Sequence, residues 1–524
     1  MKWIIKIMLP ALLLASCSKE GTSPEGNAPG VPEERQEQAS HGMMMLGEKL
    51  DNPYSLANVK AAVASLYPSS EVEDLAPTDY YVRFLPASGD EYARLEEAGV
   101  EMADHPLDRE ILQDGDYYHD PTVPEDGITW QYAVVKPGFD FPLGIRYEKL
   151  EECFIPDETT ATKGLPGIDW DAVEREAFIR TGNAGLLESA TRAKARPGGK
   201  ITIVDEGGGV KKTVGVAGVK VVANVFVKIA TTYTDKNGKY EFSKAFSMKP
   251  HYRICFQNKK GFSIGLNLVL IPASVSTLGK GDASGMDCKV DQGSEASLYR
   301  RCAVNNAAYD YYTKCETLGI TPPPSGLRFW ILNILKPSCT MMIHHGALLD
   351  NALVSNYLGM YKIIVRLAAP DITIGTKGKS HDYAALYAST VHEMAHATHF
   401  AKAGTGYWSK FATYILSSFV MTGSSYGSGN GENAGYCEVS EMWAYYLENA
   451  LYELRYGKNP QDGYNYWFKP QIFASMEKDG MAKADFCSAL TSEVTNRDIL
   501  RDRLEEARPD LRSKIEQTFN FYRR

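Results

Sequence analysis

The N-terminal part of the folded body alternates between strand-like and helix-like patterns. Residues 80–85 (Tyr-Tyr-Val-Arg-Phe-Leu) are mostly aromatic or β-branched, which favours a strand. Residues 89–98 have the composition of a helix, and Gly99 is placed to end it. We expect the next strand to begin at residues 100–102. This β-α-β order predicts a small α/β domain, which we assign to residues 43–157.

A helical connector and a β-rich region are expected next. Residues 158–199 carry large apolar side chains among Glu, Arg and Lys, which predicts the connector. Short alternating runs with turns between them then predict a β-sandwich over residues 200–275. Within it, Asn237 and Gly238 stand between two such runs. This pair predicts a tight hairpin, because both central residues of that turn need a positive φ.

The last region, residues 297–524, is predicted to be mainly α-helical. One of its segments has an apolar stripe at helical spacing, formed by Val439, Trp443, Tyr446, Ala450 and Leu454. The other face of that segment carries Glu438, Glu441, Tyr445 and Glu448. The whole pattern predicts a multidomain protein with a small α/β N-terminal domain, a β-sandwich middle domain and a mainly α-helical C-terminal domain.

The composition is that of a globular protein. The chain has 524 residues, of which 44% are hydrophobic and 23% are charged, and its net charge is −9. No basic stripe stands out, so we expect no nucleic-acid partner.

The N-terminus reads as a sorting signal. Lys2 and Lys6 precede an apolar run that ends at Ala15, and this run is too short to span a bilayer as a helix. The sequence Leu-Ala-Ser-Cys that closes it at Cys17 resembles the lipobox of bacterial lipoproteins. That resemblance implies a signal peptide at residues 1–16 and lipidation of Cys17. Residues 17–42 are poor in large apolar side chains, which predicts a flexible tether.

The residues after Cys17 bear on localisation. Ser18 at the second mature position resembles the outer-membrane sorting signal of Gram-negative lipoproteins, and Lys19-Glu20 resembles the surface-export signals of Bacteroidetes lipoproteins. We therefore expect an outer-membrane lipoprotein, held to the membrane by its N-terminal lipid only. Whether its body faces the periplasm or the cell surface stays open.

The sharpest motif is His-Glu-Met-Ala-His at residues 392–396. Residues at positions i and i+4 of a helix share a face, so His392 and His396 can bind one metal ion. Glu393 can then act as the general base toward a water molecule. The alanine-rich flanks favour a helix, and Gly404 is a plausible end for it.

The third ligand is expected from a second helix. The metzincin pattern requires glycine at position 399 and histidine at position 402, where this chain has His399 and Lys402. The segment Glu441-Met-Trp-Ala444 resembles instead the Glu-x-x-Ala element of gluzincin aminopeptidases, which implies Glu441 as third ligand. Glu438 stays open as the alternative. The glutamate that is not the ligand is expected to accept a hydrogen bond from a ligand histidine.

The β-rich region carries a second resemblance. Gly-Val-Lys-Val at residues 218–221, followed by Thr-Asp-Lys-Asn-Gly-Lys-Tyr at residues 234–240, is similar to the carboxypeptidase regulatory-like (transthyretin-like) domain. The resemblance implies an accessory β-sandwich without chemistry of its own.

These observations predict a lipid-anchored zinc metallopeptidase that hydrolyses a protein or peptide substrate with Zn²⁺ as cofactor. The Gly-x-Met-x-Asn element of the exopeptidases is absent before the motif, where residues 387–390 read Tyr-Ala-Ser-Thr, and this favours an endopeptidase. The alternative is a surface binding lipoprotein for a glycan or a protein, with a structural or vestigial zinc site. Glu393 discriminates between them, because a purely structural site needs no general base.

A few residues near the motif have open roles. His399 is expected in the core or beside a ligand rather than as a ligand. Tyr436, Tyr445 and Tyr446 are candidates to stabilise an oxyanion, although core packing is the competing interpretation. The Gly/Ser-rich residues 423–435 fit either a lid or a plain connector.

Overall fold

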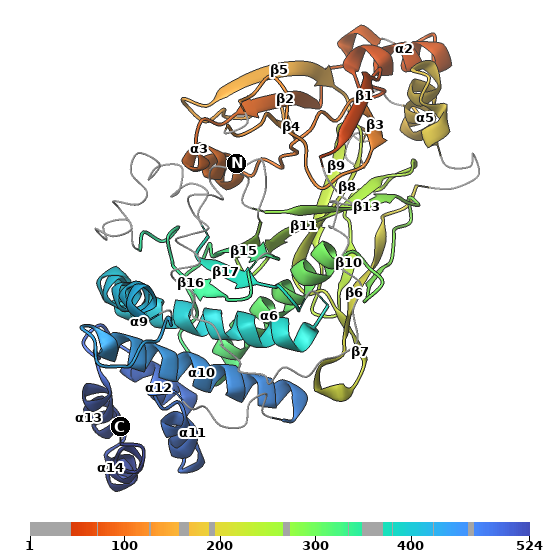
Figure 1. Ribbon diagram of the computed structural model, residues 1–524. Coiled ribbons are helices and arrows are strands. Elements are labelled where there is room, and N and C mark those ends of the chain that lie inside the picture. Colours follow the sequence, from red (N-terminus) through yellow and green to blue (C-terminus); the bar gives the residue numbers. More distant parts are fainter. Residues whose placement is uncertain are drawn as a thin grey trace, which may run out of the picture.

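Sheet dominates the N-terminal region and packed helices dominate the C-terminal region, which confirms the coarse division that the sequence predicts (Figure 1). The structure is a computed structural model, and it describes residues 43–523 apart from residues 71, 125–126, 157–166, 188–193, 266–272, 334, 348–369, 380, 423 and 459–465. The predicted signal peptide, Cys17 and the tether lie outside these described residues. Among the helices described, none is both long and apolar enough to cross a bilayer.

An antiparallel sheet forms the centre of the N-terminal unit. Its strands, in sheet order, are β4 (Gln131–Val135), β2 (Asp79–Leu85) and β5 (Arg146–Cys153). The strand and the helix predicted at the start of this unit are present as β2 and as α3 (Gly89–Glu97). The Ser88 hydroxyl caps α3 by accepting a hydrogen bond from the Glu91 amide, and Gly99 after the helix has a φ of 74°.

The prediction that a strand begins at residues 100–102 is wrong. Val100 is buried in the core of the unit, and nearby the chain makes only an isolated bridge between Ala103 and Tyr132. The next strand is β3 (Arg109–Gln113), which pairs with β1 (Met45–Lys49) in a separate small sheet. The β-α-β pattern therefore does not close, because the short run after α3 packs on the core through Val100 and Met102 and does not pair as a strand.

Two sheets make up the middle region. The first contains β6 (Gly198–Asp205), β7 (Lys212–Gly215), β10 (Lys239–Glu241) and β14 (Cys288–Val290). The second begins with β8 (Val219–Val225), β9 (Lys228–Tyr233), β11 (His251–Asn258), β12 (Ser263–Ile264) and β13 (Val275–Lys280). Ile201 and Ile203 of the first sheet belong to the same buried cluster as Val219 and Val221 of the second. The two sheets therefore share one core.

The turn at Asn237 and Gly238 forms, but it does not build the predicted two-residue hairpin. Only Gly238 has a positive φ, of 78°, and the strand after it, β10, pairs with β6 rather than with β9. The Asp235 carboxylate sets the turn by accepting hydrogen bonds from the amides of Asn237 (2.8 Å) and Lys239 (2.9 Å). A Cβ on Gly238 would lie 2.0 Å from the carbonyl oxygen of Ile201, so this turn requires glycine.

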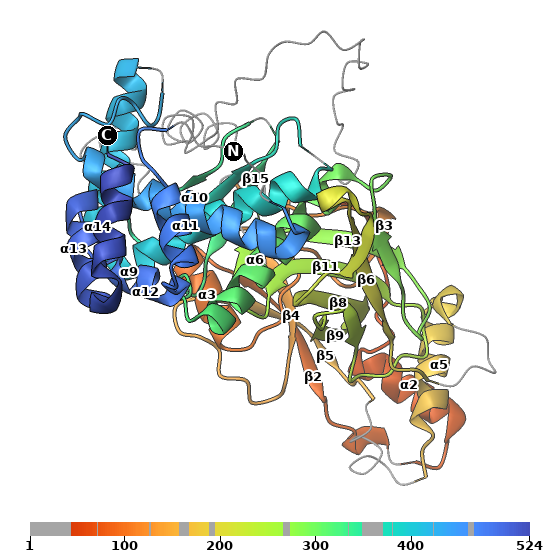
Figure 2. The same ribbon diagram turned by 90° about the horizontal axis from the view of Figure 1, so that it is seen from below.

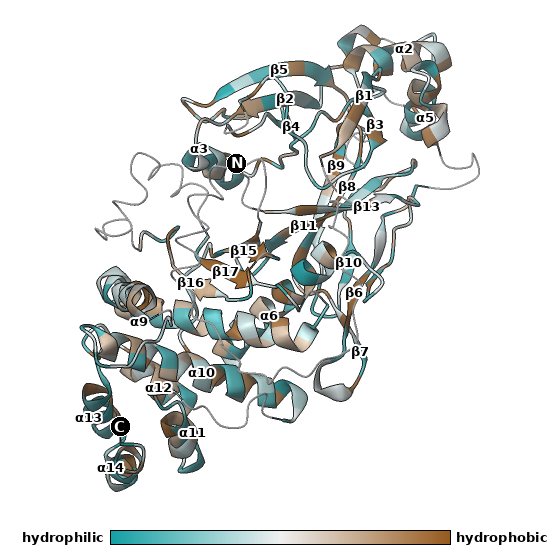
Figure 3. Cartoon of the chain, in the orientation of Figure 1, coloured by the Kyte–Doolittle hydropathy of each residue, from teal (hydrophilic) through white to brown (hydrophobic). Residues whose placement is uncertain are grey.

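The second sheet continues into the region predicted as helical. β12 pairs in parallel with β15 (Arg328–Leu332), which pairs in parallel with β17 (Ile372–Gly375), and β16 (Cys339–Thr340) lies antiparallel to β17 at the edge. Together these strands form one eight-stranded sheet. β15 and β17 are strongly hydrophobic, as expected for strands that are covered on both faces (Figure 3). The middle and C-terminal regions are thus joined by hydrogen-bonded strands.

The helices of the C-terminal region stack in layers against this sheet (Figures 1 and 2). In chain order they are α6 (Ala296–Leu318), α9 (Tyr383–Thr422), α10 (Ala434–Tyr456), α11 (Gln471–Lys478), α12 (Lys483–Ala489), α13 (Arg497–Ala507) and α14 (Arg512–Phe521). α6 and α9 lie next to the sheet, α10 packs on α9, and the shorter helices pack against α10 and one another.

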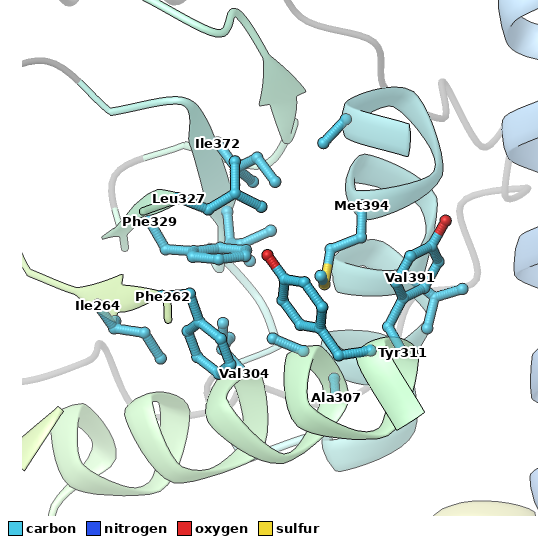
Figure 4. Close-up of a cluster of buried hydrophobic side chains, with 14 of the residues drawn as sticks. Phe262, Ile264, Val304, Ala307, Tyr311, Leu327, Phe329, Ile372, Val391 and Met394 are labelled. Atoms are coloured by element: carbon cyan, nitrogen blue, oxygen red, sulfur yellow. The ribbon is translucent and has the colours of Figure 1, made fainter. Parts of the chain in front are cut away.

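Hydrophobic contacts fix the orientation of α9. Val391 and Met394 on this helix are fully buried, together with Tyr311 of α6 and with Phe329 and Ile372 of the sheet (Figure 4). The two side chains immediately flank His392 and Glu393 in the sequence. Their burial against α6 and the sheet leaves the neighbouring face of α9 to be covered by α10.

A buried carboxylate ties the predicted connector to the rest of the protein. Within the connector, α5 (Trp170–Arg180) packs on α2 (Leu56–Leu66), and Glu174 of α5 is 2% exposed. Its carboxylate accepts hydrogen bonds from Lys228 Nζ (2.8 Å) and from the hydroxyls of Tyr54 (2.7 Å) and Ser247 (2.9 Å). Burial alone would raise the pKa of Glu174, but Lys228 and Lys194 lower it to about 2.

We expect Glu174→Gln to destabilise the fold by about 3–5 kcal/mol, because Lys228 would keep a buried charge without its partner. The pKa of Glu174 in the folded state lies below the ordinary value of 4.5. The stability that its carboxylate contributes is therefore present above about pH 4.5 and is lost as the pH falls toward 2. Urea denaturation at neutral pH and at about pH 3 measures both effects. Glu176→Gln on the same helix is the control and should change stability by under about 0.5 kcal/mol. Equal losses in the two variants would contradict this account.

Candidate metal centre

His392, Glu393 and His396 lie in the first part of α9. This part ends at the predicted residue, since Gly404 interrupts the helical dihedrals with φ 77° and ψ 179°. His392 and His396 are one turn apart, and their ring centroids are 4.9 Å apart. Both rings face α10, with exposed fractions of 5% and 0%. The predicted helical placement of the motif is therefore present.

Glu441 of α10 completes a three-residue group with the two histidines. Its Oε2 lies 3.5 Å from His392 Nε2, and its Oε1 lies 3.4 Å from His396 Nε2. One ligand atom from each of the three residues lies within 4.8 Å of the other two. The group is therefore compact enough for all three side chains to coordinate a single ion.

The atoms that face one another in this group suit a cation. Apart from these contacts of 3.4–3.5 Å with one another, both Nε2 atoms and both carboxylate oxygens of Glu441 are buried without a hydrogen-bond partner among the residues that the structure describes. Buried polar atoms are rarely left in that state. Burial alone would raise the pKa of Glu441, but His396 and His392 lower it to about 2, so its carboxylate is ionised. Two imidazole nitrogens and one carboxylate oxygen are a donor set that binds a metal ion.

The second ring nitrogen of each histidine is held by α10. Glu448 Oε2 lies 3.1 Å from His392 Nδ1, and Ser440 Oγ lies 3.0 Å from His396 Nδ1. Acceptors at Nδ1 keep the proton there, which leaves Nε2 free to coordinate a metal. Ser440 Oγ also lies 3.2 Å from Nδ1 of His399. Burial and the nearby His396 lower the pKa of His399 to about 3, and this side chain is not among the three residues grouped as possible metal ligands.

Glu393 lies beside the group without belonging to it. Its carboxylate accepts a 2.7 Å hydrogen bond from the hydroxyl of Thr340, which lies on the edge strand β16. Burial raises the pKa of Glu393 to about 8, with a further contribution from the charge of Glu441 and opposing contributions from His392 and Thr340. A carboxyl group with this pKa exchanges protons near neutral pH, as a general base must.

Glu438, the alternative third ligand, is directed elsewhere. It is 2% exposed, and its Oε1 lies 3.9 Å from Nη1 of Arg497 on α13. The expectation that the other glutamate would orient a ligand histidine is therefore wrong for Glu438. Glu448 and Ser440 take that role.

Aromatic side chains enclose the centre. Trp408, in the part of α9 after Gly404, is fully buried, and its ring centroid lies 5.9 Å from that of His396. The ring centroid of Phe411 lies 5.5 Å from the same imidazole. The Trp408 indole donates a 3.1 Å hydrogen bond to the carbonyl of Thr340. This second part of α9 thus covers the end of β16 next to Glu393.

Of the three tyrosines considered for an oxyanion, only Tyr445 lies at the centre. Its ring is 4.5 Å from that of His392, and its hydroxyl lies 2.9 Å from the hydroxyl of Tyr426. Tyr446 donates to Glu477 instead, and Tyr436 packs on Tyr407. The described part of the Gly/Ser-rich segment places Tyr426 in this aromatic group.

Three polar residues at the centre were not assigned a role from the sequence. Glu448 carried a usable signal, because it follows Glu441 by seven residues on the same helical face. Ser440 and Thr340 carried none, since a single hydroxyl residue has no diagnostic spacing. Their roles emerge only when α10 and β16 are brought against α9.

Comparison with known proteins adds no relative. No family model, no curated protein and no solved structure matches this chain. The functional assignment therefore depends on the geometry of the centre itself.

Proposed function

We propose that the protein is a zinc metallopeptidase that cleaves internal peptide bonds. The observation that carries this proposal is the set of buried, unpartnered ligand atoms of His392, His396 and Glu441, with Glu393 next to them but outside the set. Three protein ligands leave a tetrahedral zinc ion with one open position, which is typical of catalytic rather than structural sites.

The residues of the chain divide the proposed chemistry among themselves. A zinc ion held by the three ligands supplies a Lewis acid that polarises the scissile carbonyl. Glu393 accepts the proton of the attacking water and delivers it to the leaving amine. Thr340 orients the Glu393 carboxylate through its hydroxyl, while Glu448 and Ser440 orient the two imidazoles.

One observation favours the second candidate function, a binding lipoprotein with a structural zinc site. The four side chains of the centre are between 0% and 5% exposed: His392, Glu393, His396 and Glu441. The Thr340 carbonyl, next to Glu393, already accepts a hydrogen bond from the Trp408 indole. A peptide that contacts Glu393 would have to displace part of the surrounding structure, because this side chain is 1% exposed. In this candidate function, the partner would be a glycan or a protein and the metal would only stabilise the fold.

Metal analysis together with a hydrolysis assay separates these two functions. The purified full chain should contain close to one zinc ion and should cut a denatured protein mixture at internal bonds, as mass spectrometry of the products would show. A chelator should stop cleavage and added Zn²⁺ should restore it, because the Lewis acid leaves and returns. Bound zinc without any cleavage would support the structural site, and a chain that binds no zinc would contradict both functions.

The remaining parts of the proposal concern the other regions and the location. We propose that the two sheets of the middle region form a transthyretin-like accessory sandwich and that the helices around the centre form a zincin-like catalytic domain. An N-terminal signal peptide and a lipid on Cys17 would place the protein in the outer membrane, facing the periplasm or the cell surface. The motif at Cys17 supports this location.

Replacing Cys17 with serine should release the protein from the membrane fraction, because a serine carries no acyl chain to insert into the bilayer. Detergent phase partitioning of whole-cell extracts measures the shift from the detergent to the aqueous phase. Ser18→Ala is the matched control and should stay with the membrane. If the Cys17→Ser protein partitioned like the parent, the lipoprotein assignment would be wrong.

A further inference from the structure

A serine hydroxyl of α10 lies between two histidine rings of α9. Ser440 Oγ is 3.0 Å from Nδ1 of His396 and 3.2 Å from Nδ1 of His399. All three side chains are fully buried, with exposed fractions of 0%. Among the residues that the structure describes, these two nitrogens are the only hydrogen-bond partners of the hydroxyl. The position of the hydroxyl proton is therefore linked to the positions of the two ring protons.

The metal-binding role of His396 fixes one end of this arrangement. Its Nε2 lies 3.4 Å from Oε1 of Glu441, so Nε2 is the nitrogen that would coordinate the ion. A neutral imidazole that binds a metal through Nε2 carries its proton on Nδ1. The Nδ1–H of His396 therefore donates a hydrogen bond to Ser440 Oγ. This step rests on the zinc site of the proposed function.

The hydroxyl proton of Ser440 is then left with a single acceptor. A hydroxyl has one proton to donate, and His396 Nδ1 is already acting as a donor. The remaining partner is Nδ1 of His399, which must be unprotonated in order to accept. His399 therefore carries its ring proton on Nε2, which makes it the opposite tautomer from His396.

The alternative tautomer of His399 leaves more polar groups unsatisfied. If this ring carried its proton on Nδ1, both imidazoles would donate to Ser440, and the hydroxyl proton would have no acceptor among the described residues. Nε2 of His399 is without a hydrogen-bond partner in either case. The alternative thus leaves two buried groups unpaired where the first arrangement leaves one, and an unpaired buried polar group is costly.

We propose that His399 is a positioning residue of the metal centre, which acts on the ligand His396 through the hydroxyl of Ser440. Hydrogen bonds in a chain strengthen one another, so a hydroxyl that donates to His399 is a better acceptor for the Nδ1–H of His396. A stronger acceptor at Nδ1 makes the coordinating nitrogen more basic and holds the ring in its orientation. His392 needs no such relay, because its Nδ1 faces the carboxylate of Glu448 directly.

The zinc affinity of three variants of the purified full chain tests this proposal, with a chromogenic chelator as competitor. His399→Leu removes the acceptor at similar volume and should weaken zinc binding by about tenfold, the lower end of what partners of ligand histidines contribute. His399→Asn should keep the affinity near that of the parent, because its side-chain oxygen can accept from Ser440 near the position of Nδ1. His381→Leu is the matched control, since His381 contacts Tyr299 outside the centre.

A double-mutant cycle shows whether His399 acts through the serine. Ser440→Ala alone should weaken zinc binding by about 10–100-fold, because the Nδ1–H of His396 loses its acceptor. In the Ser440→Ala chain, His399→Leu should cause little further loss, since the residue through which it acts is gone. The same loss from His399→Leu in both backgrounds would mean that His399 contributes independently of Ser440, and this would overturn the proposal.

Nuclear magnetic resonance of the zinc-loaded parent chain gives a readout that packing alone would not set. Proton–nitrogen spectra of isotope-labelled histidine distinguish protonated from unprotonated ring nitrogens. We expect His396 as the Nδ1–H tautomer and His399 as the Nε2–H tautomer, with the His399→Asn chain identifying the signals of His399.

Three results would overturn the proposal while the metal centre stands. They are parent-like zinc affinity of His399→Leu, equal losses in folded His399→Leu and His399→Asn chains, and an Nδ1–H tautomer of His399 in the zinc-loaded parent. A parent chain that binds no zinc would overturn the metal centre itself and this proposal with it, so the two failures are distinguishable.

Discussion

Glu393→Gln should lower peptide hydrolysis by about 10²–10⁴-fold while the chain keeps close to one zinc ion. The amide has nearly the same shape as the carboxylate, so the contact with the Thr340 hydroxyl can persist. It cannot accept a proton from water, which removes the proposed base. Glu393 is not among the three grouped ligand residues, so the metal should stay.

The experiment pairs an activity assay with metal analysis of the same preparation. Glu432→Gln is the matched control, because Glu432 is exposed in the loop before α10 and should affect neither readout. Hydrolysis at the parent rate by Glu393→Gln would remove Glu393 from the mechanism. Loss of zinc together with activity would show instead that Glu393 helps to hold the metal.

Glu441→Gln should weaken zinc binding by more than about 100-fold, whereas Glu438→Gln should leave it nearly unchanged. Substituting a residue that only orients a ligand typically costs about 10–100-fold in affinity, and the loss of a direct ligand costs more. Glu441 lies 3.5 Å from His392 and 3.4 Å from His396, while Glu438 lies next to Arg497. Competition with a chromogenic chelator gives both affinities.

Glu438→Gln is also the matched control, because it makes the same carboxylate-to-amide substitution at another buried glutamate of the same helix. It should reduce stability rather than metal binding, since Arg497 loses the nearby charge. Thermal unfolding in excess chelator separates these effects. Retention of zinc by Glu441→Gln and its loss from Glu438→Gln would mean that Glu438, rather than Glu441, is the ligand from α10.

Local patterns were sufficient for some elements of this fold. The strand at residues 80–85 and the helix that ends before Gly99 are present because each depends on residues close in sequence: β-branched and aromatic side chains, a serine cap and a glycine stop. The same holds for the helix that carries the metal-binding motif, whose end at Gly404 is set by its own backbone.

Long-range pairing was beyond these patterns. The Asn-Gly pair predicts a hairpin, yet β10 pairs with β6, because Asp235 closes a different turn and Gly238 packs directly on Ile201. Likewise β15, β16 and β17 lie in the region predicted to be mainly α-helical and extend the sheet of the middle region. Strand partners far apart in sequence leave no local signature.

The candidate centre shows the same division. The sequence by itself determined that His392 and His396 share a helix face, because a spacing of four residues matches one turn. It also placed Glu438, Glu441 and Glu448 on one side of a second helix. Only the tertiary structure decided which of these meets the histidines, because the rotation of α10 against α9 depends on how their buried side chains pack.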